Sequence, residues 1–463
     1  MSVWESFIAN LPEVVSPTQK KLSFNEKLKW TGICLGLYFT LGLIPLFGLG
    51  QNSLQQFEYF SIILAAQFGS IISLGIGPIV TASIVLQLLN GSGLVKFDLS
   101  THEGKKNFQG VQKLLSIFFI IFESSIYVFM GGLAPTGTPE TNPLFFQTQI
   151  LLVIQLTIGG LIIMFMDEIV SKWGFGSGIS LFIAAGVSDE IVLRSLSPLP
   201  SPTNPEIATG AIPALFQSLA RGEAVTALLM LASVVFTIVV FLIVVYAQSM
   251  KVEIPMSFGR IRGHGIRWPL SFIYTSNIPV ILTAALMANI QLWARLLQNW
   301  GHPFLGKFSG NTPISGFVSW LYSPDIVPKL IKGSLALSDL SHALVYVLFM
   351  VCGSIIFSIF WVQTAGMDAR SQAKQIMASG LQIPGFRKDQ RVLERLLDRY
   401  IWPLTIMGAI TVGLLASFAD LTGALSRGTG ILLSVMIVYK MYEEIAQQHM
   451  MDMNPMMRKF MQT

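Results

Sequence analysis

Long runs of apolar residues recur along the whole chain, separated by shorter polar or charged segments. Because a membrane-spanning helix needs about 20 mostly apolar residues, ten of these runs are candidate spans. Their expected bounds are 30–49, 75–90, 112–132, 147–166, 178–194, 224–248, 270–294, 341–365, 401–419 and 430–446. The pattern therefore predicts an all-α integral membrane protein with ten transmembrane helices.

The second run differs from the others because a separate apolar stretch precedes it, Phe60 to Ile72. Gly69, Gly75 and the pair Gly77-Pro78 interrupt the sequence between the two. This pattern predicts a half-helix followed by a full helix. Broken helices at membrane depth are tolerated where they are buried in protein or line a cavity. The second run therefore indicates a pore or a binding site.

Composition and charge agree with a membrane protein and indicate its orientation. The chain is 52% hydrophobic and 12% charged, whereas soluble domains carry about 25% charged residues. With the N-terminus in the cytosol, 23 of the 30 lysines and arginines lie in cytosolic segments and 7 lie outside. Cytosolic loops carry such an excess of Lys and Arg. We therefore expect both termini in the cytosol.

Two short motifs recur and indicate an internal repeat. Gly176-Ser177-Gly178-Ile179 opens the fifth span and Gly428-Thr429-Gly430-Ile431 opens the tenth, while Pro78-Ile79-Val80 and Pro279-Val280-Ile281 match in the second and seventh. The matching spans run in opposite directions, which is typical of an inverted repeat. The expected parts are an N-terminal half with an interfacial helix (1–196), a linker (197–204) and a C-terminal half (205–463).

Polar residues inside the predicted spans are candidate functional residues, because they are costly in a bilayer. Glu123 is the one charge near the middle of a span, and Thr81, Gln87 and Asn277 are further polar residues. Each of them can instead serve as a contact between helices, which contributes on the order of 1 kcal/mol. We favour the structural interpretation for Thr81 and Gln87 taken alone, and the functional one for Glu123 with Asn277.

The sequence offers little for catalysis or for ion coupling. A proton or ion transporter carries several ionisable residues within its spans, and an intramembrane protease needs a Ser/His pair or two deep aspartates. Here Asp167 and Asp420 fall at span ends, and we expect Asp167 in a loop with Glu168. No metal-binding or nucleotide-binding motif is present, so we expect neither an enzyme nor a cofactor. An inverted-repeat secondary transporter remains the alternative function.

Two expected cytosolic loops, 250–268 and 366–400, are long, basic and punctuated by glycine. One interpretation is that their charge only fixes the orientation of the chain. The other is that arginines on projecting tips bind a phosphate backbone, such as RNA on a large partner. The candidate residues are Arg260, Arg262, Arg387 and Lys388.

Several strings together carry a resemblance to a known family. They are 27–32 (KLKWTG), 74–82 (LGIGPIVTA), 167–172 (DEIVSK), 176–179 (GSGI), 252–255 (VEIP) and 276–281 (SNIPVI). With these strings, and over nearly its whole length, the chain resembles the SecY family, the large subunit of the Sec translocon. The loop forms are most similar to the archaeal and eukaryotic branch.

The resemblance implies a channel that translocates unfolded polypeptides and inserts membrane proteins sideways into the bilayer, with two five-helix halves around a pore. A ring of aliphatic side chains would close its waist, at Ile76, Val80, Ile179, Ile183, Ile281 and Leu433. A plug at about 61–72 would contribute Leu64, Phe68 and Ile71. A lateral gate would contain Thr81, Gln87, Glu123 and Asn277, and the two basic loops would dock the ribosome.

The resemblance also implies partners and a location. The expected partners are SecE-type (gamma) and Sec-beta-type small subunits, the ribosome, signal sequences, nascent polypeptides and the lipid bilayer. The expected location is the cell membrane, and the driving force would come from partners. Family plugs often carry a basic residue where this chain has Gln67, so a role of that charge in orienting signal sequences is not expected here.

Overall fold

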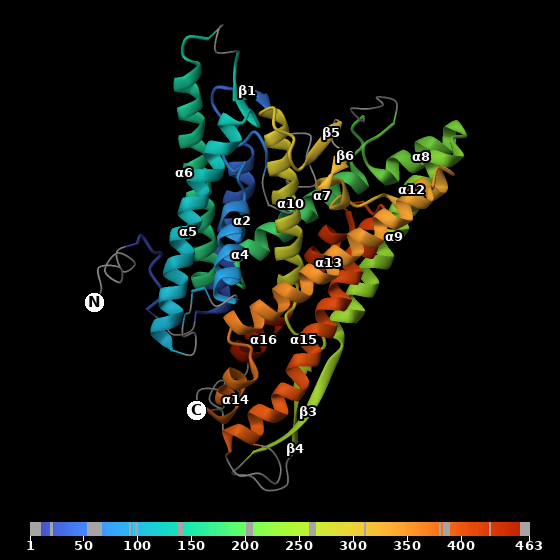
Figure 1. Cartoon of the computed structure of the whole chain (residues 1–463). Helices are drawn as coiled ribbons and strands as arrows, with labels where there is room; N and C mark the ends of the chain where they lie inside the picture. Colours follow the sequence, from blue (N-terminus) through green and yellow to red (C-terminus); the bar gives the residue numbers. More distant parts are fainter. Residues whose placement is uncertain are drawn as a thin grey trace.

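Long apolar helices that run side by side make up most of the structure, a computed structural model (Figure 1). It describes residues 11–18, 22–52, 67–91, 94–95, 97, 101–137, 142–200, 207–258, 265–309, 312–378, 381–382, 389–425 and 427–453. The first helices are α2 (Phe24–Gly42), α4 (Gly77–Gly91), α5 (His102–Phe129), α6 (Phe145–Trp173) and α7 (Gly178–Leu196). The later helices are α8 (Ala211–Arg221), α9 (Ala224–Ser249), α10 (Ile278–Asn299), α11 (Phe317–Trp320), α12 (Ile326–Ile331), α13 (Leu337–Thr364), α14 (Ala369–Ala378), α15 (Gln390–Leu421) and α16 (Arg427–Met453).

Each of the ten predicted runs coincides with a helix over most of its length. In the described part of the chain, six helices are long and apolar enough to cross a membrane, namely α5, α6, α9, α10, α13 and α15. On α9 the exposed side chains are mainly apolar, among them Leu228, Ile238 and Phe241. An apolar surface of this extent marks contact with lipid.

Helices α5 and α15 begin ten and eleven residues before the spans predicted at 112–132 and 401–419, and two other spans are shorter than predicted. The first helix ends at Gly42 rather than at residue 49, and strand β1 (Leu49–Asn52) follows, paired with β2 (Leu133–Pro135). Pro45 interrupts the helical pattern there, because the residue before a proline avoids the helical conformation. The seventh helix starts at Ile278 rather than 270, since Ser276 has a positive φ of 58° and Pro279 suits a first helical turn.

The expected half-helix that ends near Ile72 is only partly described, and its described end is not helical. Residues 68–76 form a series of turns. Gly69 and Gly75 adopt positive φ values of 101° and 56°. The Ser70 and Ser73 hydroxyls donate hydrogen bonds to nearby backbone carbonyls, and such local bonds compete with helix formation. Residues 61–66 of the predicted plug lie outside the described residues.

The two expected cytosolic loops contain regular structure with a hydrophobic core of their own. Strands β3 (Lys251–Phe258) and β4 (Gly265–Ser271) form an antiparallel hairpin, and β7 (Leu381–Gln382) pairs with the other edge of β3. In β3, Lys251 and Glu253 are exposed while Ile254 is buried, which is the alternation of a half-buried strand. A second hairpin, β5 (Gly306–Ser309) with β6 (Thr312–Gly316), follows α10.

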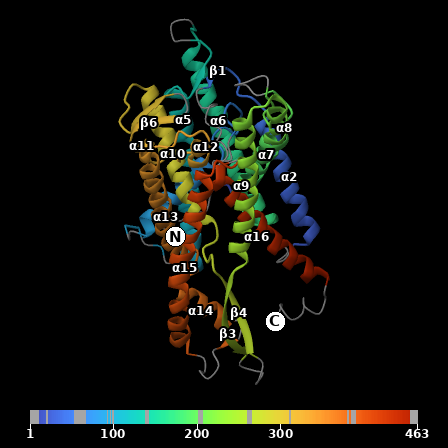
Figure 2. The same ribbon diagram turned by 90° about the vertical axis from the view of Figure 1, so that its right-hand side faces the viewer.

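The main core joins the two parts of the chain. Buried residues of α4, α6 and α7 belong to the same cluster as those of α10, α13 and α16. Figures 1 and 2 show the hairpin of β3 and β4 projecting from one end of this bundle, beside α14 and the start of α15. A second cluster, which includes Ile254, Leu270 and Leu397, holds that projecting region together.

Candidate functional site

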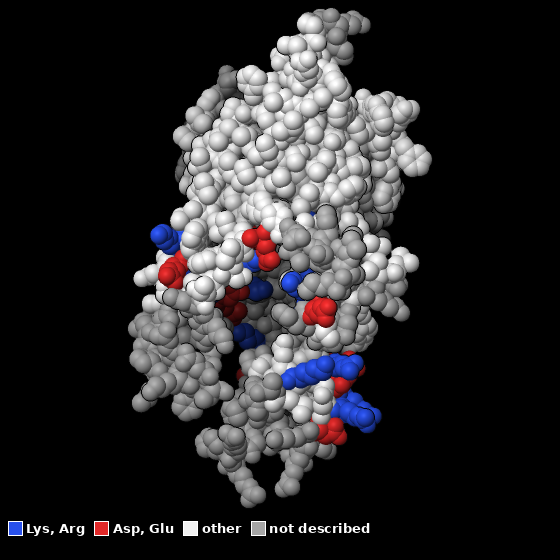
Figure 3. All heavy atoms as spheres, turned by 90° about the vertical axis from the view of Figure 1, so that its left-hand side faces the viewer, with Lys and Arg blue, Asp and Glu red and all other residues white. Residues whose placement is uncertain are grey.

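A cavity of about 660 Å³ opens among six helices drawn from both parts of the chain. Its lining residues belong to α4, α5, α7, α10, α13 and α16. In the space-filling view, one broad part of the surface carries no charged side chain, whereas charges gather below it around a hollow (Figure 3). This distribution of charged side chains indicates a lipid-facing band and a water-facing end.

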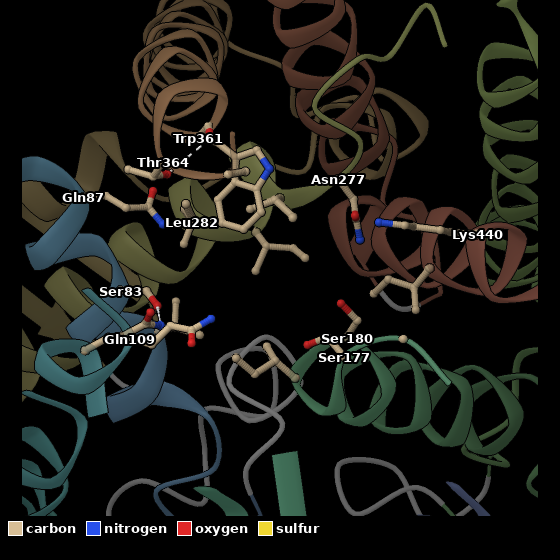
Figure 4. A pocket seen from close by; sticks show the side chains of 18 of the residues that line it. Ser83, Gln87, Gln109, Ser177, Ser180, Asn277, Leu282, Trp361, Thr364 and Lys440 are labelled. Atoms are coloured by element: carbon tan, nitrogen blue, oxygen red, sulfur yellow. Dashed lines mark hydrogen bonds between the residues drawn. The ribbon is translucent and has the colours of Figure 1, made fainter. Parts of the chain in front are cut away.

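Charged and polar side chains line part of the cavity. Lys105, Lys440 and Glu444 are the charged lining residues. In Figure 4, Asn277 and Lys440 point toward each other, with Ser177 and Ser180 on the neighbouring helix. Because polar groups of several kinds are spread around a large volume, the cavity has the character of a hydrated vestibule rather than of a binding pocket for one ligand.

Aliphatic side chains line another part of the cavity. Of the six predicted ring residues, Val80, Ile179 and Ile281 line the cavity, and Ile437 does so from α16. The other three predicted residues are almost fully buried, with exposed fractions of 0–1%: Ile76, Ile183 and Leu433. Five of the six belong to the main core cluster, and Ile179 is partly buried and packs against it. In channels, rings of aliphatic side chains exclude water and ions by dewetting.

The helices that carry five of these residues pack against one another in series, and Ile76 directly precedes α4. Helix α4 contacts α10, α10 contacts α16, and α16 contacts α7. The proline motifs in the first turns of α4 and α10 place Val80 and Ile281 early in their helices. The glycine motifs do the same for Ile179 and Leu433 in α7 and α16. The four helix beginnings thus supply most of the aliphatic residues.

A polar cluster lies between α4, α5 and α10. The Thr81 hydroxyl lies 3.1 Å from Glu123 Oε1, and Asn289 Nδ2 donates a hydrogen bond of 2.8 Å to Thr81 Oγ1. The exposed fractions of the three side chains are 6%, 1% and 5%. Two of the predicted gate residues, Thr81 and Glu123, are therefore in contact, and Asn289 joins them across 208 positions of sequence.

This cluster leaves polar atoms without partners. Within the described residues, Glu123 Oε2, Asn289 Oδ1 and Tyr127 Oη are buried and make no hydrogen bond. A buried polar atom without a partner costs about 1–3 kcal/mol. The polar contacts between α4, α5 and α10 therefore contribute little net stabilisation.

The other two predicted gate residues lie elsewhere. Gln87 and Asn277 both line the cavity, and Figure 4 shows them on opposite sides of it. Asn277 Oδ1 accepts a hydrogen bond of 3.1 Å from the Ser276 hydroxyl, and neither residue contacts Glu123 through a hydrogen bond described here. Asn289 lies inside the predicted span 270–294, so the same search for polar residues in spans could have found it.

The described part of the predicted plug packs against α6. Ile71 donates its N–H to Ile44 O over 3.0 Å, and its carbonyl lies so close to Gly159 that a Cβ there would overlap it. Phe68 and Ile71 both pack on the main core cluster. Leu64 lies outside the described residues. The segment that returns to α4 is thus fixed to the first half of the bundle.

The four predicted docking residues, Arg260, Arg262, Arg387 and Lys388, also lie outside the described residues. The strands that lead to them are described and are paired side by side. Ser257 is opposite Gln382, and Phe258 is opposite Leu381. Because the pairing is antiparallel, β3 ends at Phe258 beside the first residue of β7, and β7 ends at Gln382 beside Ser257.

Comparison with known proteins gives consistent matches over the whole chain. Residues 70–442 match the SecY family, and residues 37–69 match the family described as the plug domain of Sec61p. The protein translocase subunit SecY of Methanothermobacter thermautotrophicus is 47% identical and covers 99% of this chain and 98% of its own. The plug match begins before the predicted plug of residues 61–72 and overlaps it at 61–69.

Solved structures agree with these matches. A structure of a protein-conducting channel is similar with a TM-score of 0.82 and 43% identity, covering 96% of this chain and 97% of that one. A structure of Sec61 in the canine ribosome–channel complex from the endoplasmic reticulum gives a TM-score of 0.79, 43% identity and coverage of 96% and 97%.

Proposed function

We propose a gating mechanism for this chain, which belongs to the SecY family and is a protein-conducting channel with a plug domain. It is a multi-pass membrane protein, and its activity is that of a translocase pore rather than of a catalytic enzyme. A channel for unfolded chains must pass every kind of side chain. Its narrowest part must therefore seal without specific polar ligands.

The observation that carries the proposal is the aliphatic part of the cavity. Ile76, Val80, Ile179, Ile183, Ile281 and Leu433 form the seal of the closed pore. Their helices, α4, α7, α10 and α16, pack in a continuous series. Aliphatic side chains offer no hydrogen bonds to water or ions, so the closed waist is dewetted. During transport the same side chains pack around whichever segment of polypeptide occupies the pore.

The polar cluster stabilises the closed state of a lateral gate, a seam between helices through which a signal helix can leave into the bilayer. Helices α4 and α5 lie on one side of the seam and α10 and α13 on the other, with contacts from α4 to both. Thr81 and Glu123 belong to one side and Asn289 to the other. A single hydrogen bond between helices contributes about 0.6–2 kcal/mol. A hydrophobic signal helix that binds in the seam can therefore shift the gate toward its open state.

The finer architecture follows the inverted repeat. We propose ten spans in two halves around the pore, with both termini in the cytosol of a cell whose plasma membrane holds the channel. The helices found at all ten predicted runs support this number. The concentration of charge around the cavity mouth in Figure 3 supports a cytosolic vestibule at that end. The plug, which includes Leu64, Phe68 and Ile71, would close the opposite funnel.

The partners are proposed by analogy and by charge. The canine relative forms a ribosome–channel complex. In this chain the two basic segments follow strands that are paired through β3 and β7, so Arg260, Arg262, Arg387 and Lys388 would act as one docking site for ribosomal RNA. Small SecE-type (gamma) and Sec-beta-type subunits would complete the complex. Signal sequences and nascent chains are the substrates.

Ion conductance of reconstituted channels tests the proposed seal. Ile179→Ser together with Ile281→Ser should let water into the constriction and raise the resting leak of ions several-fold. Ile154→Ser is the matched control, because Ile154 is 49% exposed on α6 and belongs to the lipid-facing surface. Equal conductance in the wild type and in the ring variant would mean that these isoleucines are ordinary core residues.

A further inference from the structure

Two buried or half-buried carboxylates occupy corresponding places in the two halves of the chain. Asp167 lies near the end of α6, directly before α7, and Asp420 lies near the end of α15, directly before α16. Both were expected at span ends, and Asp167 was expected in a loop. The structure instead places both within helices and directs each toward the first turn of the following helix.

At the first place, the carboxylate of Asp167 holds the beginning of α7. Its Oδ1 accepts a hydrogen bond of 2.9 Å from the backbone N–H of Ile179. The helix has no capping hydrogen bond from its own N-cap residue, Ser177. Gly178 is also fitted against Asp167, since a Cβ at Gly178 would come within 2.5 Å of the Asp167 Cα. The start of α7 is thus set by α6.

At the second place, Asp420 holds the beginning of α16 in the same manner. Its Oδ1 accepts a hydrogen bond of 2.7 Å from the backbone N–H of Thr429, and its Oδ2 accepts one from the Thr429 hydroxyl. The hydroxyl of Tyr346 on α13 donates to the same Oδ2 over 2.6 Å. Asp420 is 1% exposed and Thr429 is 0% exposed. This carboxylate therefore joins three helices.

Both contacts fall within the repeated glycine motif, although at different positions of it, since Ile179 corresponds to Ile431 and Thr429 to Ser177. Ile179 belongs to the motif Gly176-Ser177-Gly178-Ile179, and Thr429 belongs to Gly428-Thr429-Gly430-Ile431. The first N–H groups of a helix have no partner within the helix, and a negative charge at that end is favourable. At both places the acceptor comes from the preceding helix.

We propose that Asp167 and Asp420 are paired positioning residues that fix the depth and tilt of the two pore helices, α7 and α16. In α7, Asp167 binds the backbone N–H of the ring residue Ile179 itself, and the ring residue Ile183 follows one turn later. In α16, Asp420 binds the backbone N–H of Thr429, and the ring residue Leu433 follows one turn later. The proposal rests on the proposed aliphatic seal for its functional consequence. In the inverted topology, Asp167 acts at the cytosolic end and Asp420 at the outer end, so one carboxylate anchors one pore helix from each face.

Distances between spin labels test the anchoring without reference to the seal. Labels on introduced cysteines at Ile158 and Leu193 report α6 relative to α7, and labels at Leu414 and Val438 report α15 relative to α16; all four positions are exposed. Cys352, which is exposed, is first replaced by alanine, whereas Cys34 is buried. Asp167→Ala should shift or broaden the first distance by on the order of 1.5 Å, the rise of one helical residue, and leave the second unchanged. Asp420→Ala should do the reverse.

Matched variants separate anchoring from a general loss of structure. Asp167→Asn keeps one acceptor oxygen for the Ile179 N–H, so its distances should stay at wild-type values. Glu168→Gln changes the adjacent carboxylate, which pairs with Lys113 and not with α7, and should also leave the distances unchanged. If Asp167→Ala does not accumulate, Asp167→Glu moves the acceptor by one methylene and should give the same shift. Unchanged distances in the variants that lose or displace the acceptor, or an equal shift in Glu168→Gln, would overturn the proposal.

Resting ion leak then links each anchor to its own ring residue. Asp167→Ala should raise the leak several-fold, and combining it with Ile179→Ser should add little, because both changes disturb the same helix. Combining Asp167→Ala with Leu433→Ser should multiply the two effects. Should Ile179→Ser and Leu433→Ser cause no leak, the proposed seal fails while the label distances still decide the anchoring. If Asp167→Ala changed the leak of Ile179→Ser and of Leu433→Ser by the same factor, each carboxylate would not act on its own pore helix.

Discussion

Asn289→Leu tests how the lateral seam is balanced between closed and open. In the closed seam, Asn289 Nδ2 donates to Thr81 Oγ1 over 2.8 Å, while Asn289 Oδ1 is buried without a partner among the described residues. Leucine removes one interhelical hydrogen bond of about 0.6–2 kcal/mol. It also removes an unsatisfied oxygen that costs about 1–3 kcal/mol, and it buries an apolar side chain where Asn289 is 5% exposed.

These contributions favour the closed seam in the variant. Opening would give water or a signal peptide access to both polar atoms of Asn289, whereas leucine gains nothing from that access. Removing the unsatisfied oxygen gains about 1–3 kcal/mol, which exceeds the hydrogen bond that is lost, and van der Waals packing of leucine between the helices adds to this gain. We expect a net stabilisation of the closed state by about 1–2 kcal/mol, which reduces the open fraction roughly 5- to 30-fold.

The assay is translocation into proteoliposomes of two precursors that differ only in the hydrophobicity of their signal sequence. Translocation of the precursor with the weak signal should fall by nearly the same factor as the open fraction. The strong signal binds with more free energy, so translocation of its precursor should fall much less. Gln291→Leu is the control, because Gln291 is equally buried on α10 but donates to Leu321 O rather than across the seam. Equal losses for both signals, or the same loss in Gln291→Leu, would refute the reasoning.

Three further outcomes are expected. Gly159→Ala should lower the free energy of unfolding by about 1–3 kcal/mol through overpacking, because the new Cβ would overlap the Ile71 carbonyl. The control is Gly36→Ala, which has open space around it and should be neutral or stabilising in thermal unfolding. Reversing Arg387 and Lys388 to glutamate should weaken co-sedimentation with ribosomes more than neutralising them and should flatten its salt dependence; unchanged binding across a salt series would leave these charges with a role in orientation only. Cysteines introduced at Ser100 and Asn311 should label from opposite sides of sealed vesicles, and labelling from one side would contradict the ten-span topology.

The amino-acid sequence by itself determined the helices and the chemical character of the site. Long apolar runs require helices, since each helix satisfies its own backbone hydrogen bonds in a membrane. Glu123 stood out as a charge within a span, and Thr81 lies within hydrogen-bonding distance of it. The aliphatic nature of the six ring residues is likewise a property of the sequence, which the family resemblance placed at the waist of a pore. Local signals also explain the corrected ends of the first and seventh helices, at Pro45 and Pro279.

Only the tertiary structure decided which of these residues meet. Periodicity gives the face of a helix on which a residue lies, but it does not give the partner helix that packs there. The sequence therefore favoured Asn277 for the seam, whereas the contact with Thr81 comes from Asn289 on the same helix. Two further contacts also join distant segments. Strand β3 pairs with β7, and Asp420 accepts hydrogen bonds from Tyr346 on α13 and Thr429 on α16. Such contacts depend on how helices cross, and the crossing is set by the packing of the whole bundle rather than by any one segment.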